Sequence, residues 1–260
     1  MIELKHINKS FGTKTVLEDV SWEMQSGKVN LIIGTSGSGK TVLMKCLVGL
    51  ISPDAGSIAY EGADFLNMDP KGRKELRTQI GMLFQGSALF DSMTVEQNVM
   101  FPLDMFTKQT LNEKKQRVNE VLDRVNLKDT NKKFPAELSG GMKKRVALAR
   151  AIVLNPKYLF CDEPNSGLDP MTSLVIDKLI IEITQEYNMT TVINTHDMNT
   201  VMESGDRIIF LFKGRKEWEG SKEDIIFSKN KSLNDFIFAS EFLREAKNKR
   251  MQDAEVSRKA

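Results

Sequence analysis

A glycine-rich segment, GTSGSGKT, runs from Gly34 to Thr41 and matches the pattern G-x-x-x-x-G-K-[ST]. The glycines let the backbone turn tightly and aim N–H groups at phosphate oxygens, and the helix that follows points its positive end at the same anion. In this pattern the lysine reaches the β- and γ-phosphates and the last hydroxyl binds Mg²⁺. The segment therefore predicts a nucleotide triphosphate site made of Gly34, Thr35, Ser36, Gly37, Ser38, Gly39, Lys40 and Thr41.

Two adjacent acids, Asp162 and Glu163, follow the apolar run Tyr158–Cys161. A buried strand that ends in a carboxylate places it at the sheet edge where open α/β folds bind ligands. Two neighbouring carboxylates are costly without a positive partner, and a metal ion with a polarised water relieves that cost. Asp162 is therefore predicted to hold Mg²⁺ through water.

The segment LSGGM at Leu138–Met142 begins a predicted helix. Ser139 can cap its first turn, and Gly140 and Gly141 permit the close approach of an anion. The basic run Lys143–Arg145 lies in the first turns, where positive charge opposes the helix dipole. We interpret this as a helix end that faces a polyphosphate, and a solvated basic face is the alternative.

The elements that must position these residues alternate between strand and helix, which predicts a mostly parallel sheet covered on both faces. Strands are expected at Ile2–Lys9, Val29–Ile33, Gly56–Tyr60, Gly81–Phe84, Tyr158–Cys161, Thr190–Asn194 and Arg207–Phe212. Helices are expected at Lys40–Leu50, Pro70–Gln79, Val95–Leu103, Asn112–Val125, Gly140–Asn155 and Met171–Tyr187. The stretch of about 86–155 lacks Val/Ile-rich strands until its end, so it is predicted to be an inserted helical subdomain.

Bulk properties exclude several classes of protein. The chain has 260 residues, 40% hydrophobic and 28% charged, which fits one large α/β domain and leaves no room for two tandem nucleotide-binding units. The net charge of +2 gives no signal for nucleic acid. Cys46 and Cys161 lie in apolar runs typical of reduced core thiols. With no apolar run of about 18–20 residues and no signal peptide, we expect a cytosolic chain unless a partner holds it at a membrane.

The order of the three segments resembles the ATP-binding subunit of an ABC transporter, and the resemblance extends to about Phe227. It implies an α/β P-loop NTPase core with a mostly parallel sheet, an antiparallel β subdomain and the inserted helical subdomain. The ATPase domain would span residues 1–231, and residues 232–260 would form a C-terminal helix and charged tail. Thr35 and Asn165 depart from the family pattern, which commonly has Pro and Thr at these positions.

The resemblance also assigns roles. Glu163 matches the general base for the attacking water, His196 the switch histidine at the γ-phosphate, and Gln85 the glutamine that senses Mg²⁺. Ser139, Gly140 and Gly141 match the signature that serves the ATP of a second subunit, so the family implies a homodimer that encloses two ATP molecules with Mg²⁺. Asp169 matches the loop that crosses the dimer contact. We choose Phe11 for the aromatic that stacks on adenine, although an aromatic at a strand end is often core.

The segment Leu83–Leu103, together with LSGGM, is similar to the Mla-type ATPases of lipid-trafficking complexes. This predicts an ATPase that drives phospholipid movement between envelope membranes, peripheral on the cytoplasmic face of the inner membrane. Its partners would be integral-membrane permease subunits, a periplasmic lipid-binding protein and a small accessory protein, with no nucleic acid. Leu89, Phe90 and Met93 would suit a groove for the permease, or they are simply subdomain core.

Other functions remain open. An importer of a small solute, such as an amino acid or a metal, is the alternative cargo class. A non-transport ABC ATPase fits less well, because translation-type relatives carry two cassettes and repair-type relatives carry long coiled coils or zinc-binding cysteines. The C-terminal stretch Ser232–Lys247 has an apolar helical face that must bury against its own core, the second subunit or an accessory protein.

Overall fold

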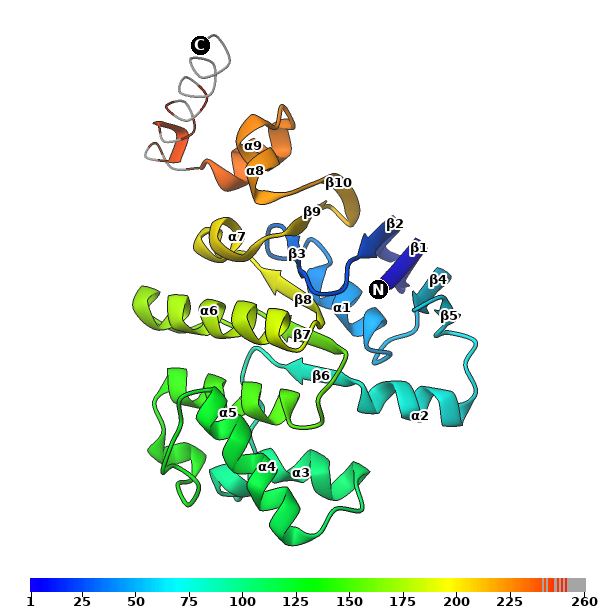
Figure 1. The fold of residues 1–260 in the computed structure, drawn as a ribbon. Helices are drawn as coiled ribbons and strands as arrows, with labels where there is room; N and C mark the ends of the chain where they lie inside the picture. Colours follow the sequence, from blue (N-terminus) through cyan, green and yellow to red (C-terminus); the bar gives the residue numbers. More distant parts are fainter. Residues whose placement is uncertain (240, 242, 246, 248, 250, 252–260) are drawn as a thin grey trace.

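A six-stranded sheet forms the centre of the fold in the computed structural model, which describes residues 1–239, 241, 243–245, 247, 249 and 251 (Figure 1). Its strand order is β10-β9-β3-β8-β7-β6, and every neighbouring pair is parallel except β10 with β9. The strands are β3 (Val29–Ile33), β6 (Ile80–Leu83), β7 (Tyr158–Asp162), β8 (Thr190–Thr195), β9 (Arg207–Phe212) and β10 (Arg215–Gly220). The predicted mostly parallel sheet is confirmed, and β10 is a strand that the sequence pattern missed.

A second, antiparallel sheet has the order β2-β1-β4-β5. Its strands are β1 (Ile2–Phe11), β2 (Lys14–Met24), β4 (Ala55–Tyr60) and β5 (Ala63–Asp64). The pairing of β1 with β2 shifts register between Leu4 and Lys9, which breaks the strict alternation of apolar residues. This irregularity explains why β2 escaped prediction from sequence.

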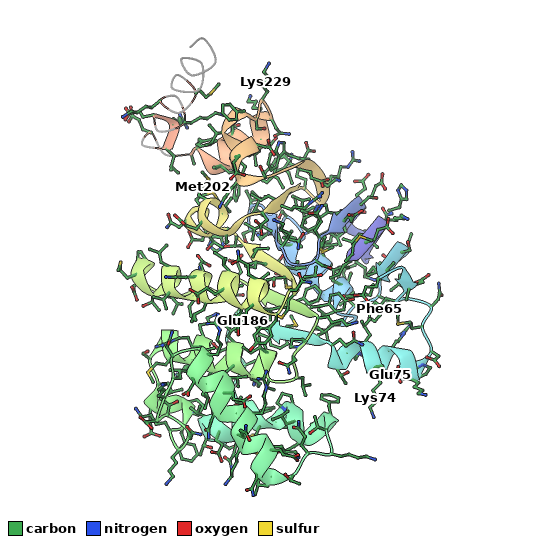
Figure 2. All side chains as sticks on the ribbon, viewed as in Figure 1. Phe65, Lys74, Glu75, Glu186, Met202 and Lys229 are labelled. Carbon is green, nitrogen blue, oxygen red and sulfur yellow. The ribbon has the colours of Figure 1, made fainter. Side chains whose placement is uncertain are left out.

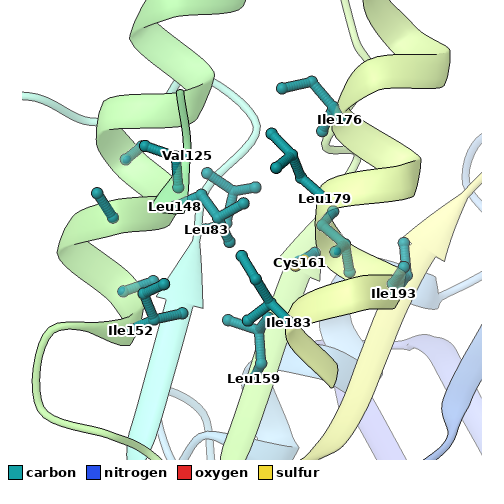
Figure 3. Packing of buried hydrophobic residues seen from close by; sticks show 14 of the residues in the cluster. Leu83, Val125, Leu148, Ile152, Leu159, Cys161, Ile176, Leu179, Ile183 and Ile193 are labelled. Atoms are coloured by element: carbon teal, nitrogen blue, oxygen red, sulfur yellow. The ribbon is translucent and has the colours of Figure 1, made fainter. Parts of the chain in front are cut away.

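Alternate side chains of the central sheet supply two separate hydrophobic cores. Leu159 and Cys161 of β7 pack against α5 and α6, whereas Tyr158 and Phe160 point to the opposite face and pack with the antiparallel sheet and α1. Figure 3 shows the first core from close by, with Leu159 and Cys161 beside Ile152 and Ile183. Both cysteines are buried and free, as expected, and burial raises the pKa of both thiols.

Helices cover both faces of the central sheet, and some of them lie beyond its β6 edge (Figure 1). The helices are α1 (Lys40–Leu47), α2 (Pro70–Thr78), α3 (Val95–Phe106), α4 (Leu111–Arg124), α5 (Gly140–Ile152), α6 (Pro170–Glu186), α7 (Met198–Ser204), α8 (Lys222–Phe227) and α9 (Lys231–Ile237), with a 3₁₀ turn at Pro135–Glu137. Thr94 and Thr110 start α3 and α4 with capping boxes. Glu186, labelled in Figure 2, accepts from Arg124 at 2.6 Å and ties α4 to α6.

The C-terminal helix α9 packs on the chain's own core. Leu233 and Ile237 are buried in the same cluster as β9 and α6 residues. Phe236 stacks on Phe210 of β9, with ring centroids 5.3 Å apart. Within the predicted helical stretch Ser232–Lys247, α9 ends at Ile237, and the described residues Glu241, Leu243, Arg244, Glu245 and Lys247 are again helical. The other residues of that stretch beyond Ala239 lie outside the described part of the chain.

None of the helices in the described residues has the length and apolar character needed to span a membrane.

Candidate functional site

The glycine-rich loop joins β3 to α1, and its glycines are required by close backbone contacts. A Cβ at Gly34 would lie 2.3 Å from the Leu211 carbonyl oxygen, and a Cβ at Gly39 would lie 2.8 Å from that of Val16. Gly39 is also the N-cap of α1 in the left-handed conformation, with φ of 107°. The loop therefore wraps against β2 and β9 in a shape that other residues cannot adopt.

Lys40 places its ammonium group inside this loop. Its Nζ donates to the carbonyl oxygens of Gly34 at 2.8 Å and Thr35 at 3.2 Å. Burial lowers the pKa of Lys40, and the nearby carboxylates of Glu163 and Asp162 act against that shift. The buried Ser38 hydroxyl has no hydrogen-bond partner in the described residues. A cation and an unused hydroxyl in one loop fit the oxygens of a phosphate chain.

A cavity of about 920 Å³ opens over the loop and is large enough for a nucleotide. Its walls are formed by the start of β2, the glycine-rich loop with the start of α1, the residues that follow β6, β7 and β8, and residues of the C-terminal region. The lining residues are Lys14, Thr15, Val16, Thr35, Ser36, Gly37, Ser38, Gly39, Lys40, Thr41, Val42, Gln85, Glu163, His196, Lys213, Gly214 and Phe236. The cavity thus brings together most of the residues that the sequence assigned to ATP and to catalysis.

Oxygen ligands suited to Mg²⁺ meet at the loop and the end of β7. Thr41 Oγ1 lies 3.5 Å from Asp162 Oδ1, which also accepts from Asn194 Nδ2 at 3.1 Å. Gln85 lines the same cavity, and its Nε2 lies 3.3 Å from Ser166 Oγ. Mg²⁺ is usually held by one or two carboxylates together with substrate phosphates, so this small set of hard oxygen donors fits it.

Glu163 and His196 are in direct contact, with Glu163 Oε2 and His196 Nδ1 2.8 Å apart. The Glu163 side chain is 13% exposed and that of His196 is 64% exposed. Glu163 has a left-handed backbone with φ of 48°, and its N–H donates to the Asn194 carbonyl at 3.0 Å. A strained backbone of this kind persists only where the surroundings hold it, and it aims the carboxylate into the cavity.

Predicted site residues outside the cavity lining are Gly34 and Asp162, whose chain neighbours Thr35 and Glu163 line it, and Phe11, Ser139, Gly140, Gly141 and Asp169. Phe11 is half exposed at the end of β1, with Lys9 Nζ 5.4 Å from its ring centroid. Ser139 caps α5, accepting from the Met142 N–H at 3.3 Å, and the glycines after it also lie away from the cavity. Asp169 is the exposed N-cap of α6. This placement agrees with a signature that serves another subunit, and the roles of these residues stay predictions.

The interpretation of the basic run Lys143–Arg145 as a helix end that faces a polyphosphate was wrong in part. Lys144 is buried and donates to the Gln85 carbonyl and, at 3.4 Å, to the Glu163 carbonyl. Arg145 donates to the Asn126 carbonyl at 2.9 Å. These side chains therefore bind backbone oxygens, and Lys144 joins the loops that carry Gln85 and Glu163. Apart from the run of charge, no sequence pattern marks this role.

Gly141 has a packing role that the sequence did not show. A Cβ at Gly141 would lie 2.5 Å from Thr172 Cγ2 on α6. The glycine therefore lets α5 and α6 approach each other closely beside the signature segment.

The C-terminal region contributes cavity residues that sequence reasoning missed. Lys213 and Gly214 form the turn between β9 and β10, and Gly214 N–H donates to the Ser38 carbonyl at 3.2 Å. Phe236 reaches the cavity from α9. No motif marks these residues, because long-range packing alone brings them to the loop.

The segment after Gln85 is fixed by two side chains from the helices. Buried Asn98 accepts from the Phe90 N–H at 2.8 Å and donates to the Phe90 carbonyl at 3.1 Å. Arg150 donates to the Ser87 and Ala88 carbonyls, both at 2.8 Å. Phe90 remains 41% exposed and packs on Phe101, with ring centroids 4.9 Å apart. The result is a rigid, partly apolar surface next to the cavity.

Comparison with known proteins places this geometry in context. The model of the family described as "ABC transporter" matches residues 17–166. The probable ribonucleotide transport ATP-binding protein mkl of Mycobacterium leprae is 40% identical over 236 residues, which cover 91% of this chain and 68% of that protein. The methionine import ATP-binding protein MetN of Campylobacter jejuni is 37% identical over 261 residues, covering 94% of this chain and 78% of that protein.

Among solved structures, the dimeric structure of MJ0796, a bacterial ABC transporter cassette, superposes with a TM-score of 0.78 at 30% identity. The match covers 85% of this chain and 99% of that one. The same cassette is also known as a dimer in a post-hydrolysis state bound to ADP and Pi.

Proposed function

This chain belongs to the ABC transporter family and is an ATPase that binds ATP with Mg²⁺, and from this premise we propose that it is the ATP-hydrolysing subunit of an importer for a small solute. The observation that carries the hydrolytic role is the Glu163–His196 pair facing the phosphate loop across one cavity. The cargo class rests on the relatives, whose names describe methionine import and ribonucleotide transport.

In the proposed mechanism the chain positions ATP and a water molecule. Lys40 exchanges its contacts with the Gly34 and Thr35 carbonyls for phosphate oxygens, where it stabilises developing charge. Glu163 accepts a proton from the attacking water, and His196 holds the carboxylate in place and faces the γ-phosphate. Thr41, Gln85 and Asp162 would hold Mg²⁺, which would supply positive charge to neutralise the phosphates.

The working unit is proposed to be a dimer attached to membrane permease subunits. Ser139, Gly140, Gly141 and Asp169 lie outside the cavity of their own chain, so a second copy has to present them to the nucleotide. The related cassette MJ0796 forms a dimer. The surface around Phe90 is proposed to receive a permease helix, which would hold the dimer on the cytoplasmic face of the membrane.

Glu163→Gln tests the catalytic assignment. The amide keeps the size of the side chain but cannot accept the proton, so turnover should fall by roughly 10²-fold or more while a fluorescent ATP analogue still binds. Lys40→Ala is the companion variant and should lose both binding strength and turnover. Near wild-type hydrolysis by Glu163→Gln would show that another group is the base.

Lipid movement is the second candidate cargo, and a specific sequence observation favours it: the Leu83–Leu103 segment with LSGGM. Purification of the native membrane complex, followed by ATPase assays, separates the two. Stimulation by an amino acid or a ribonucleotide presented with the complex's binding protein supports the importer. Stimulation only by phospholipid-loaded binding protein would replace the importer with lipid trafficking.

A further inference from the structure

A closed triangle of buried hydrogen bonds lies next to the Glu163–His196 pair. Asn165 Nδ2 donates to Asp177 Oδ1 and to Thr200 Oγ1, each at 2.9 Å. The Thr200 hydroxyl donates to the other carboxylate oxygen, Asp177 Oδ2, also at 2.9 Å. Thr200 is 0% and Asp177 2% exposed. The three side chains come from three different elements: the loop after β7, α6 and α7.

The chain links two corners of this triangle to the hydrolytic pair. Asn165 follows Glu163 and Pro164 in the same loop, and its carbonyl accepts from the Leu168 N–H at 3.1 Å. Thr200 lies in the first turn of α7. This helix follows His196 directly in the chain, and Asp197 is its N-cap. Asp177 therefore connects the loop that carries Glu163 with the helix that follows His196.

We propose that Asp177 is a positioning residue for ATP hydrolysis, whose carboxylate holds the Asn165 loop and α7 together and so maintains the contact between Glu163 and His196. Neither Asp177 nor its two partners lines the cavity, so all three act through other residues. The proposal rests on the roles proposed above for Glu163 and His196.

The chemistry of the triangle argues against a role in stability alone. Burial raises the pKa of Asp177 to about 6, the Asn165 and Thr200 hydrogen bonds act against this, and the charges of Asp197 and Glu203 on α7 add to it. Asp177 also interacts electrostatically with the buried Cys161 thiol of β7. Asn165 Oδ1 is buried with no hydrogen-bond partner in the described residues. Apolar side chains would fill such a site at a lower cost in folding free energy. A buried carboxylate beside an unpaired amide oxygen therefore indicates that the site serves more than stability.

The same substitution at two threonines provides a matched test. Thr200→Val removes the hydroxyl that contacts Asp177 and keeps the side-chain shape. Thr184→Val is the control, because Thr184 is also 0% exposed, and its hydroxyl contacts only the Ile180 carbonyl at 2.7 Å and Thr191 Oγ1 at 2.6 Å. We expect Thr200→Val to lower kcat roughly tenfold or more, with KM for ATP within about twofold. Thr184→Val should keep its kcat.

Substitutions of Asp177 test whether a conservative replacement preserves turnover where alanine does not. Asp177→Ala should reproduce the loss of kcat, and combining it with Thr200→Val should add little, because the triangle acts as a unit. Asp177→Asn should retain most of the turnover, since its amide oxygen still accepts from Thr200, and a 180° turn of the Asn165 amide lets the new NH₂ group donate to the otherwise unpaired Asn165 Oδ1.

Several outcomes would overturn the proposal. They are unchanged kcat in Thr200→Val, an equal loss in Thr184→Val, and a loss confined to nucleotide affinity. NMR of the ring of His196, one of two histidines in the sequence, is independent of turnover. Its signals should shift in Thr200→Val and not in Thr184→Val, and unmoved signals refute the positioning contact. Absence of ATPase activity in the wild-type chain would instead refute the hydrolytic roles, and the NMR comparison would still decide this contact.

Discussion

At the scale of single residues, buried charge is concentrated around one edge of the central sheet. Within the part of the chain that the structure describes, the charged side chains that are buried are Lys40, Lys144, Asp162 and Asp177. Each contacts the phosphate loop, the Gln85 and Glu163 loops, or α7. Buried charges are costly unless they are paired or hydrogen-bonded, so their shared location points to function rather than to packing.

The titration of Asp177 gives a prediction about stability and pH. The folded-state pKa of about 6 lies above the unfolded value, so the folded chain binds the extra proton between about pH 4 and 6. Stability contributed by this group therefore falls as pH rises through that window. Relative to wild type, Asp177→Asn should gain up to roughly 3 kcal/mol in unfolding free energy between pH 4 and 7.5.

Urea denaturation of the two proteins at pH 4.5, 6 and 7.5 measures this difference. Thr184→Val, which removes no titratable group, is the control and should follow wild type across the range. A difference between Asp177→Asn and wild type that stays constant with pH would mean that the pKa of Asp177 is not raised in the folded state.

At the scale of elements, sequence reasoning found the strands and helices whose apolar residues recur with the regular spacing of a strand or of a helix. The core strands β3, β7 and β9 are mostly apolar, β8 is rich in β-branched residues, and all four were placed within one or two residues. α7 has seven residues, and β10 alternates charged with half-buried positions, so neither gives a strong local signal. Likewise, motif spacing revealed the phosphate loop and Glu163, whereas Phe236 and Lys144 reach the site only through tertiary packing.

The docking of α9 on the core leads to the next prediction. Leu233 is 0% exposed and packs in the larger hydrophobic core, so Leu233→Ala should lower the unfolding free energy by about 2–4 kcal/mol. Leu174→Ala on α6 removes the same atoms from a side chain that is 43% exposed and should cost less than about 1 kcal/mol. Thermal and urea unfolding measure both variants.

Equal and small losses in the two variants would mean that α9 does not dock on the core in solution. The packing of α9 also leads to a prediction for deletion of residues from Ser232 onward. Such a deletion removes Leu233 and Ile237 from the core and Phe236 from the cavity, so it should impair folding and nucleotide binding before subunit assembly.

At the scale of the whole molecule, one chain carries the predicted parts of a nucleotide site in two separate places. The cavity holds Lys40 and Glu163, while Ser139 caps α5 elsewhere on the surface. Since both sets are needed for one ATP in the proposed dimer, two symmetric copies would complete each other's sites. This arrangement makes hydrolysis depend on association, so specific activity should rise with protein concentration until dimers form.

Mixing two inactive chains tests that arrangement. Lys40→Ala removes the phosphate cation, and Ser139→Arg places a bulky charge at the α5 cap. A heterodimer of these chains has one site with both defects and one with neither. In a random equal mixture half of the dimers are mixed, so activity should recover to roughly a quarter of the wild-type value. Each variant mixed with itself controls for residual activity. Differently tagged chains purified in tandem show that heterodimers have formed, and no recovery in that fraction would mean that Ser139 does not act on the nucleotide of a partner.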